Sequence, residues 1–98
     1  MIPFVLTPAA AEDLQKIDER LIEDSNAAAE RVSEAIEAAM TRLAAHPMLG
    51  HVRTDLTSRP YRSWSVYSHL IVYQPVPAPI QIIRVLHGAR DLPELLKI

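Results

Sequence analysis

The hydrophobic positions of this chain have a helical period in its first half and a strand-like pattern in its second. After a short apolar run at residues 4–6, apolar residues recur three and four positions apart, which predicts two helices with one apolar stripe each. The stripes consist of Leu14, Ile17 and Leu21, and then Val32, Ile36, Met40 (or Ala39) and Leu43. Short runs at 61–67, 69–74 and 80–87, rich in β-branched and aromatic residues, predict three strands.

Helix boundaries are marked by residues that favour helix ends. Thr7 followed by Pro8 is typical of a helix start, with Thr7 as the N-cap, and this helix should run to about Asp24. Ser25 or Asn26 would cap the second helix, which should stop before Pro47 because a residue preceding proline disfavours the α region. The connection is so short that the two helices should form an antiparallel hairpin.

The remaining segments complete an α+β fold in the order β-α-α-β-β-β. We expect an irregular loop over 48–60, a stiff proline turn at 76–79, and a short final helix from about 91 to 96 with Asp91 as its N-cap. Hairpin connections make the last three strands antiparallel, and the first strand should join the sheet at an edge. Residues 1–98 therefore predict one domain, an antiparallel sheet packed on a helical hairpin.

Both faces of the last strand are substantially apolar. Strict alternation places Gln81, Ile83, Val85 and His87 on one face, and Ile80, Ile82, Arg84 and Leu86 on the other. Two helices can cover only one face of a four-stranded sheet, and a face left in water should alternate more cleanly. We therefore expect a partner chain on the second face; the alternative is that the long loop and the tail cover it.

Charge is divided unevenly along the chain. Residues 7–46 contain four Lys/Arg and nine Asp/Glu, whereas residues 47–98 contain six Lys/Arg and three Asp/Glu. The acidic half is typical of a solvated helical face, and the basic half carries arginines near strands, where an anionic partner could meet them. An uneven surface charge without a partner is the simpler alternative.

Several kinds of chemistry are not supported by the sequence. There is no cysteine, the two glycines form no phosphate loop, and no helix carries a His-Glu-x-x-His pair, so we expect no metal site and no cofactor. No apolar stretch approaches the roughly 20 residues that span a bilayer, and the N-terminus lacks the features of a signal peptide. We expect a cytoplasmic protein without a membrane partner.

A metal-free acid–base site remains conceivable. His51, His69 and His87 lie in the same half of the chain as the arginines, and RNA cleavage through a 2′-hydroxyl needs only a proton carrier and a cation on the phosphate. In the structural alternative the histidines form hydrogen bonds at strand ends, Arg84 pairs with a helix carboxylate or a partner, and Arg90 pairs with Asp91. The aromatic residues Tyr61, Trp64, Tyr67 and Tyr73 could stack on bases, although packing in a core or interface is more typical.

Five segments carry a resemblance to a known family: residues 6–10 before the first helix, 43–50 at the end of the second, and 61–62, 68–73 and 82–87 in the strands. Together they resemble the RelE/ParE toxin superfamily of bacterial type II toxin–antitoxin modules. The resemblance covers nearly the whole chain and implies the β-α-α-β-β-β fold reached above from periodicity.

The resemblance also distinguishes two activities. RelE-like members cut messenger RNA on the ribosome with basic residues on the sheet and often a tyrosine near the C-terminus, whereas ParE-like members poison DNA gyrase. Here Leu70 stands where many RelE-like nucleases carry an arginine, and the tail has Leu95 and Leu96 but no tyrosine. These departures, and the run from Arg84 to His87, favour the ParE branch.

The resulting hypothesis is a ParE-like toxin of the plasmid-stabilisation type. It would bind gyrase without bond chemistry of its own, and a ParD-like antitoxin would wrap it and bind operator DNA in the complex. The candidate contact residues are Arg53, Arg62, Arg84, His87, Arg90, Ile82 and Leu86, with the tail 90–98. Two alternatives remain: a ribosome-dependent endoribonuclease with His87 as acid or base and Arg84 on phosphate, and a non-toxic relative that only binds and regulates.

Overall fold

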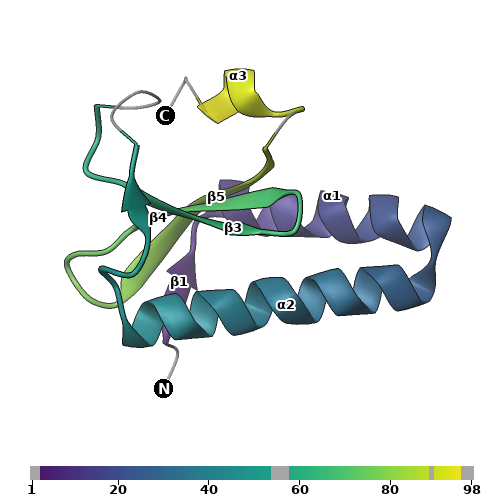
Figure 1. Cartoon of the computed structure of the whole chain (residues 1–98), viewed down its shortest axis with the longest axis horizontal. Helices are drawn as coiled ribbons and strands as arrows, with labels where there is room; N and C mark the ends of the chain where they lie inside the picture. The colour runs from purple at the N-terminus through teal and green to yellow at the C-terminus, as the bar shows by residue number, and fades with distance from the viewer. Residues whose placement is uncertain (1–2, 54–57, 89, 96–98) are drawn as a thin grey trace.

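The computed structural model describes residues 3–53, 58–88 and 90–95. Its elements are, in order, β1 (Phe4–Leu6), α1 (Pro8–Asp24), α2 (Asn26–Ala45), β2 (His51–Val52), β3 (Arg62–Val66), β4 (His69–Gln74), β5 (Ile80–His87) and α3 (Leu92–Leu95). Figure 1 shows α1 and α2 side by side as a hairpin, with the sheet between α2 and the short α3. The predicted α+β architecture is therefore confirmed.

Side-chain caps explain where the two long helices begin. Thr7 Oγ1 accepts a hydrogen bond from the backbone N–H of Ala10 at 3.1 Å and donates one to the carbonyl of Ile83 at 2.8 Å. Ser25 both ends α1 and caps α2, because its N–H donates to Leu21 and its hydroxyl accepts from Ala28 at 3.2 Å. One residue between the helices leaves room only for the antiparallel hairpin that the sequence predicts.

The sheet has five strands in the order β1-β5-β4-β3-β2. β1 lies at one edge, parallel to β5, and the other neighbours are antiparallel. The prediction of an irregular loop over 48–60 is wrong at His51 and Val52, which pair with Ser63 and Arg62 as β2. A strand of two residues is too short to show the alternation of apolar and polar side chains, so β2 is recognised only by its pairing with β3. Residues 54–57 of the predicted loop and residue 96 of the predicted final helix lie outside the described residues.

A β-bulge in β5 corrects the predicted assignment of faces. Tyr73 pairs with Ile82 and Val72 pairs with Arg84, so Ile83 is an extra residue on β5. Because side chains alternate, one inserted residue reverses the face of every position after it. Ile80 and Ile82 therefore share the helix-covered core with Val85, whereas Leu86 lies with Val72 on the other side of the sheet.

The core lies between the helical hairpin and the sheet. Its fully buried members include Ile36 and Leu43 from α2 and Ile71, Tyr73 and Ile82 from the sheet. On the second face, Val72 and Leu86 are each only 2% exposed, surrounded by Tyr61, Leu70 and Ile83. The centre of that face is thus buried within the chain itself, so its burial does not require the partner chain expected there. The short α3 lies next to β5, on the side of the sheet away from α2 in Figure 1.

The segment after α2 is fixed by one buried tyrosine. The Tyr73 hydroxyl accepts a hydrogen bond from the Gly50 N–H at 2.8 Å and donates one to the Pro47 carbonyl at 2.7 Å. A Cβ at Gly50 would lie 2.5 Å from the Tyr73 hydroxyl oxygen, so only glycine fits there. This contact brings the chain from the end of α2 to the start of β2.

Candidate functional site

The predicted site residues divide into two groups in the structure. Arg84, His87 and Arg90 lie along and just after the end of β5, with His69 opposite His87 on β4. His51, Arg53 and Arg62 lie on or beside β2 and β3 at the other side of the sheet. The sheet order puts β4 between β5 and β3, so the three predicted histidines do not form one cluster.

Arg84 is engaged by a helix carboxylate, as the structural alternative predicted. Its Nε and Nη2 donate to the two carboxylate oxygens of Asp13 on α1, at 2.7 and 2.9 Å. The same carboxylate accepts the Val85 N–H at 3.0 Å, on the part of β5 that extends past β1. This hydrogen bonding raises the pKa of Arg84 above its ordinary value. Both side chains are largely buried, so the ion pair has a structural role that links α1 to β5.

His69 and His87 form an edge-to-face pair at the end of β4 and β5. Their ring centroids lie 5.6 Å apart with an interplanar angle of 84°. His69 is 8% exposed, and its buried Nδ1 has no hydrogen-bond partner. Burial lowers the pKa of His69, and the neighbouring His87 lowers it further, against a smaller opposing effect of Asp91. The neutral imidazole of His69 is therefore favoured.

The turn after β5 uses the polar atoms of His87 and Asp91 for its own hydrogen bonds. His87 Nδ1 accepts the Arg90 N–H at 3.1 Å, and the His87 N–H donates to the Asp91 carboxylate at 3.0 Å. Arg90 and Asp91 also form an ion pair at 3.5 Å, as the structural alternative predicted. Only Nε2 of His87 is left for an outside ligand.

The two apolar candidates are not surface residues. Ile82 is completely buried and Leu86 is 2% exposed, so both stabilise the core of the free chain and cannot contact a partner without rearrangement. The bulge explains the error, because it moves the two residues into different layers and neither layer faces solvent there.

The flank around β2 and β3 is basic and aromatic. Arg62 Nη1 donates to the Gly50 carbonyl at 2.7 Å, which fixes the chain before β2. The His51 ring stacks on Trp64 with centroids 6.0 Å apart and an interplanar angle of 11°, and the guanidinium carbon of Arg42 lies 5.8 Å from the Trp64 ring centroid. Arg42 is not among the residues predicted from the sequence, because nothing in the helical pattern links a surface position of α2 to a tryptophan in β3.

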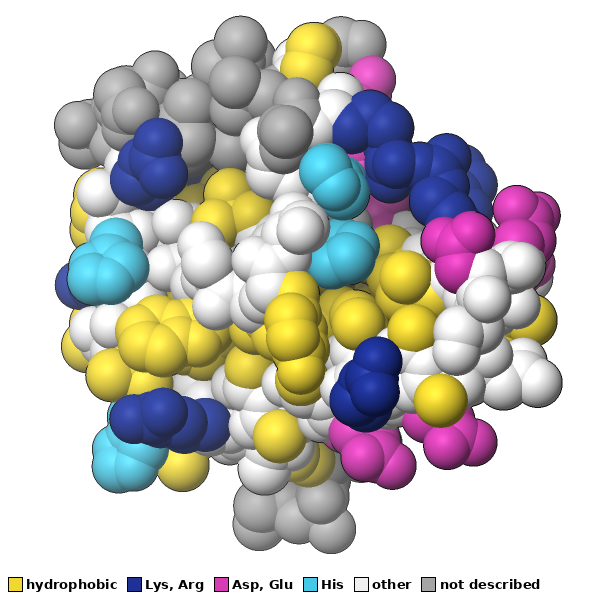
Figure 2. Space-filling view, turned by 45° about the vertical axis from the view of Figure 1, so that its right-hand side comes forward, with side chains coloured by type: hydrophobic (Ala, Val, Ile, Leu, Met, Phe, Trp, Pro, Cys, Tyr) yellow, Lys and Arg dark blue, Asp and Glu magenta, His cyan; other side chains and the backbone are white. Residues whose placement is uncertain are grey.

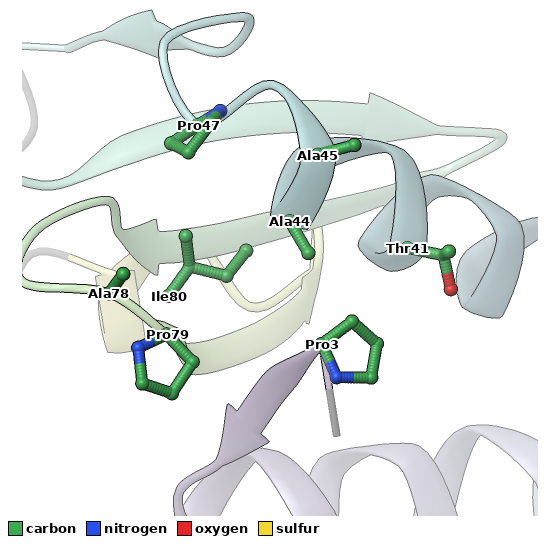
Figure 3. Close-up of a pocket in the computed structure, with 8 residues that line it drawn as sticks. All are labelled: Pro3, Thr41, Ala44, Ala45, Pro47, Ala78, Pro79 and Ile80. Atoms are coloured by element: carbon green, nitrogen blue, oxygen red, sulfur yellow. The ribbon is translucent and has the colours of Figure 1, made fainter. Parts of the chain in front are cut away.

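Two apolar hollows on the surface could accept a ligand, but the residues that line them do not form a catalytic site. One, of about 580 Å³, lies where the end of α2, the β4–β5 turn and the chain before β1 meet. In Figure 3 the rings of Pro3 and Pro79 and the side chains of Ala44 and Ile80 border it, and the Thr41 hydroxyl is the polar side-chain group in view. The second, of about 290 Å³, is a groove between β1 and the helical hairpin. Its lining residues are Phe4, Leu6, Leu14, Ile17, Ser33, Ile36, Glu37 and Met40.

The part of the chain that the structure describes contains neither a candidate metal site nor a candidate membrane-spanning helix. Across residues 3–53, 58–88 and 90–95, no three His, Asp or Glu side chains gather in a group that could hold a metal ion. Among the same residues, no helix has the length and apolar character needed to cross a bilayer.

Comparison with known protein families decides the relationship. A family model described as the ParE toxin of the type II toxin–antitoxin system parDE matches residues 4–92. The chain belongs to the ParE toxin family. The match runs from β1 to the first residue of α3, so it includes both flanks described above, and it confirms the resemblance seen in the sequence. Membership makes this chain the toxin component of a type II toxin–antitoxin module and implies an antitoxin partner. A search of the curated proteins gives no match.

Proposed function

We propose that this ParE-family toxin inhibits DNA gyrase by binding to it, with no bond chemistry of its own, and that a ParD-like antitoxin neutralises it. The observation that carries the proposal is the family match together with the state of Arg84. Arg84 is the cation that a nuclease of this fold would aim at phosphate in our alternative hypothesis. In this chain, Nε and Nη2 of Arg84 already donate hydrogen bonds to the Asp13 carboxylate.

The histidines support the same conclusion. A general acid–base residue needs a nitrogen within reach of the substrate and a pKa near neutrality. His69 is buried with its pKa lowered, and His87 spends Nδ1 on the backbone of Arg90. The hydrogen bonds of His87 stabilise the turn after β5. We therefore assign the toxic action to contacts between the toxin surface and gyrase.

The antitoxin would use the groove between β1 and the helical hairpin. This groove is lined mainly by apolar side chains, and its strand carries exposed Val5 and Leu6, at 44% and 37%. An amphipathic segment that folds on binding would cover this surface by placing its apolar face in the groove. The antitoxin would also bring the complex to operator DNA, since the toxin of this proposal acts on gyrase alone.

The test uses purified chain, gyrase, ATP and negatively supercoiled plasmid. We expect linear plasmid to accumulate after detergent and protease treatment, because gyrase trapped on cleaved DNA releases broken ends under those conditions. Preincubation with the antitoxin should abolish the linear product, and omission of gyrase should leave the plasmid intact. Unchanged supercoiling activity with no linear product, at toxin in excess over gyrase, would reject the gyrase target.

The endoribonuclease remains the second candidate because His69 and His87 do face each other across two strands. Pulse-labelling after induction, in a bacterial host without the antitoxin, separates the two functions. An early fall in DNA synthesis with damage signalling supports gyrase. An early fall in protein synthesis with cut messages supports the nuclease, and no effect on either supports the non-toxic regulatory relative.

A further inference from the structure

A cationic and aromatic surface lies at the flank of the sheet away from β1. It consists of Arg42 from α2, His51 from β2, and Arg62 and Trp64 from β3, and we call it the Trp64 platform. Arg62 and Trp64 are two positions apart on one strand, so they project from the same face. Arg42 and His51, from two other elements, thus contact the indole ring of Trp64.

The rings of the platform are arranged for stacking. Trp64 is half-buried against the core, which fixes its orientation, and the nearly parallel His51 ring is exposed. The other three aromatic candidates lack this setting: Tyr73 is buried in the core, Tyr61 packs on the second face, and Tyr67 lies in the β3–β4 turn. A planar ligand could extend the His51–Trp64 stack at its exposed end.

The charged side chains that form the platform, Arg42 and Arg62, are both cationic. One helical turn away from Arg42 lie Ala38, Ala39, Ala45 and the C-cap residue His46. Among the described residues, Arg42 has no carboxylate partner, and its guanidinium lies over the Trp64 ring. Figure 2 shows basic, histidine and hydrophobic side chains mixed along its left-hand flank, whereas Asp and Glu side chains gather in the right-hand half.

A shallow hollow of about 520 Å³ adjoins the platform. Arg42 and His46 lie on its wall with Met48 and Leu49. Arg42 therefore borders both the indole ring and the hollow, so one ligand could place a flat ring on the stack and an anionic group in the hollow. A nucleotide has this combination of parts, because each base is joined to a phosphate within a few ångströms.

We propose that the Trp64 platform binds unpaired nucleic acid, with a base stacked on the His51–Trp64 rings and the adjoining phosphates beside Arg42 and Arg62. Proteins that bind single strands combine a cationic track with aromatic rings on which bases stack. A duplex keeps its base faces covered, so it could use the cations but not the rings. An acidic peptide would likewise leave the stack unused. The inference does not rest on the proposed gyrase function, since it concerns a surface of the free chain.

Trp64 is the one tryptophan of the chain, so its fluorescence reports the platform directly. We would titrate the purified chain with a 20-nucleotide single-stranded DNA, the same sequence as RNA, and the DNA duplex, without gyrase. Either single strand should quench the emission to saturation, and the duplex should not. The two single strands distinguish a DNA ligand from an RNA ligand. For the two cations Arg42 and Arg62 on phosphates, the logarithm of the association constant should fall linearly with the logarithm of the salt concentration, with a slope of about −1.4.

Charge-reversal variants on one helix provide the matched control. Arg42→Glu should weaken single-strand binding about tenfold or more, whereas Arg31→Glu, an exposed arginine on the same helix, should change it less than about twofold. His51→Ala should weaken binding about fivefold or more, as the loss of a stacked base predicts. Circular dichroism would confirm that each variant is folded.

Four results would overturn the proposal. They are the absence of saturable quenching, equal binding of the duplex, equal weakening by Arg31→Glu and Arg42→Glu, and displacement of the single strand by an equal concentration of oligoglutamate. The last would assign the surface to an acidic protein segment. The gyrase cleavage assay can succeed or fail independently of all four, so the two proposals are tested separately.

Discussion

Arg84 on β5 and Asp13 on α1 form a two-pronged ion pair between residues 71 positions apart in the sequence. The Asp13 carboxylate also accepts the Val85 N–H, so one side chain satisfies a strand cation and an unpaired strand N–H together. This relationship attaches the first helix to the last long strand just after the bulge at Ile83. Arg84 therefore has a structural role, because its guanidinium is held by the Asp13 carboxylate.

Removal of Asp13 should therefore destabilise the chain strongly. Asp13→Ala leaves the Arg84 guanidinium and the Val85 N–H without their partner in a largely buried place, and the free energy of unfolding should fall by about 3 kcal/mol. Urea unfolding followed by circular dichroism measures this. The control is Glu12→Ala, which breaks the exposed Glu12–Lys16 pair and should cause no measurable change. Equal stability of Asp13→Ala and the parent chain would show that the pair contributes nothing.

Tyr73 should be sensitive to the loss of a single oxygen. Tyr73→Phe keeps the ring but leaves the Gly50 N–H and the Pro47 carbonyl without their hydrogen bonds, which should cost about 2 kcal/mol of unfolding free energy. Gly50→Ala should cost at least as much, because its Cβ would collide with the Tyr73 hydroxyl and the Ser63 carbonyl. The double variant tests the coupling: Gly50→Ala should cost less when Phe replaces Tyr73. Simple additivity would contradict a direct contact.

Thr7 should contribute both to α1 and to the sheet. Thr7→Ala removes the cap on Ala10 and the hydrogen bond to Ile83, so we expect a loss of about 2 kcal/mol, at the upper end for an N-cap. Thr7→Ser preserves the hydroxyl and should retain most of the stability. Thermal unfolding of the two variants gives the comparison, and the interpretation fails if serine is as damaging as alanine.

His69 should make the fold weaker in acid. Its pKa is lowered in the folded chain, so below pH of about 6.5 the unfolded chain takes up a proton that the folded chain resists. The free energy of unfolding should consequently decrease as the pH falls through that value, until the folded pKa is passed. His69→Gln should flatten this decrease between pH 7.5 and roughly pH 5.5. Identical pH profiles for His69→Gln and the parent would refute this assignment.

Substitution of His87 distinguishes a gyrase inhibitor from an endoribonuclease. His87→Ala should leave growth inhibition and gyrase-dependent DNA cleavage within about threefold of the parent, because no proton transfer is required of it. A nuclease that used His87 as acid or base would lose about a hundredfold or more. The measurement pairs growth after induction with message integrity, and Asp91→Ala serves to detect effects of the turn itself, since the Asp91 carboxylate accepts the His87 N–H.

The sequence by itself determined most of the backbone of this fold. The stripes at Leu14 and Ile36 and the caps at Thr7 and Ser25 act within a few residues, so they predict α1 and α2 almost to their ends. The strands β4 and β5 have the predicted bounds, because their apolar runs are bordered by turn residues. Family resemblance carried by the same segments led to the ParE toxin family.

Only the tertiary structure decided which side chains meet. β2 exists because β3 offers it partners, and the bulge at Ile83 is defined by pairing with β4, so neither leaves a period in the sequence. Asp13 reaches Arg84, and Arg42 reaches Trp64, because packing brings different elements together at those points. Local propensity acts over a few residues, whereas the site depends on contacts across the whole chain. For this reason the family and the elements could be predicted from the sequence, whereas the carboxylate that pairs with Arg84, the layer that contains Ile82 and the cation that contacts Trp64 could not.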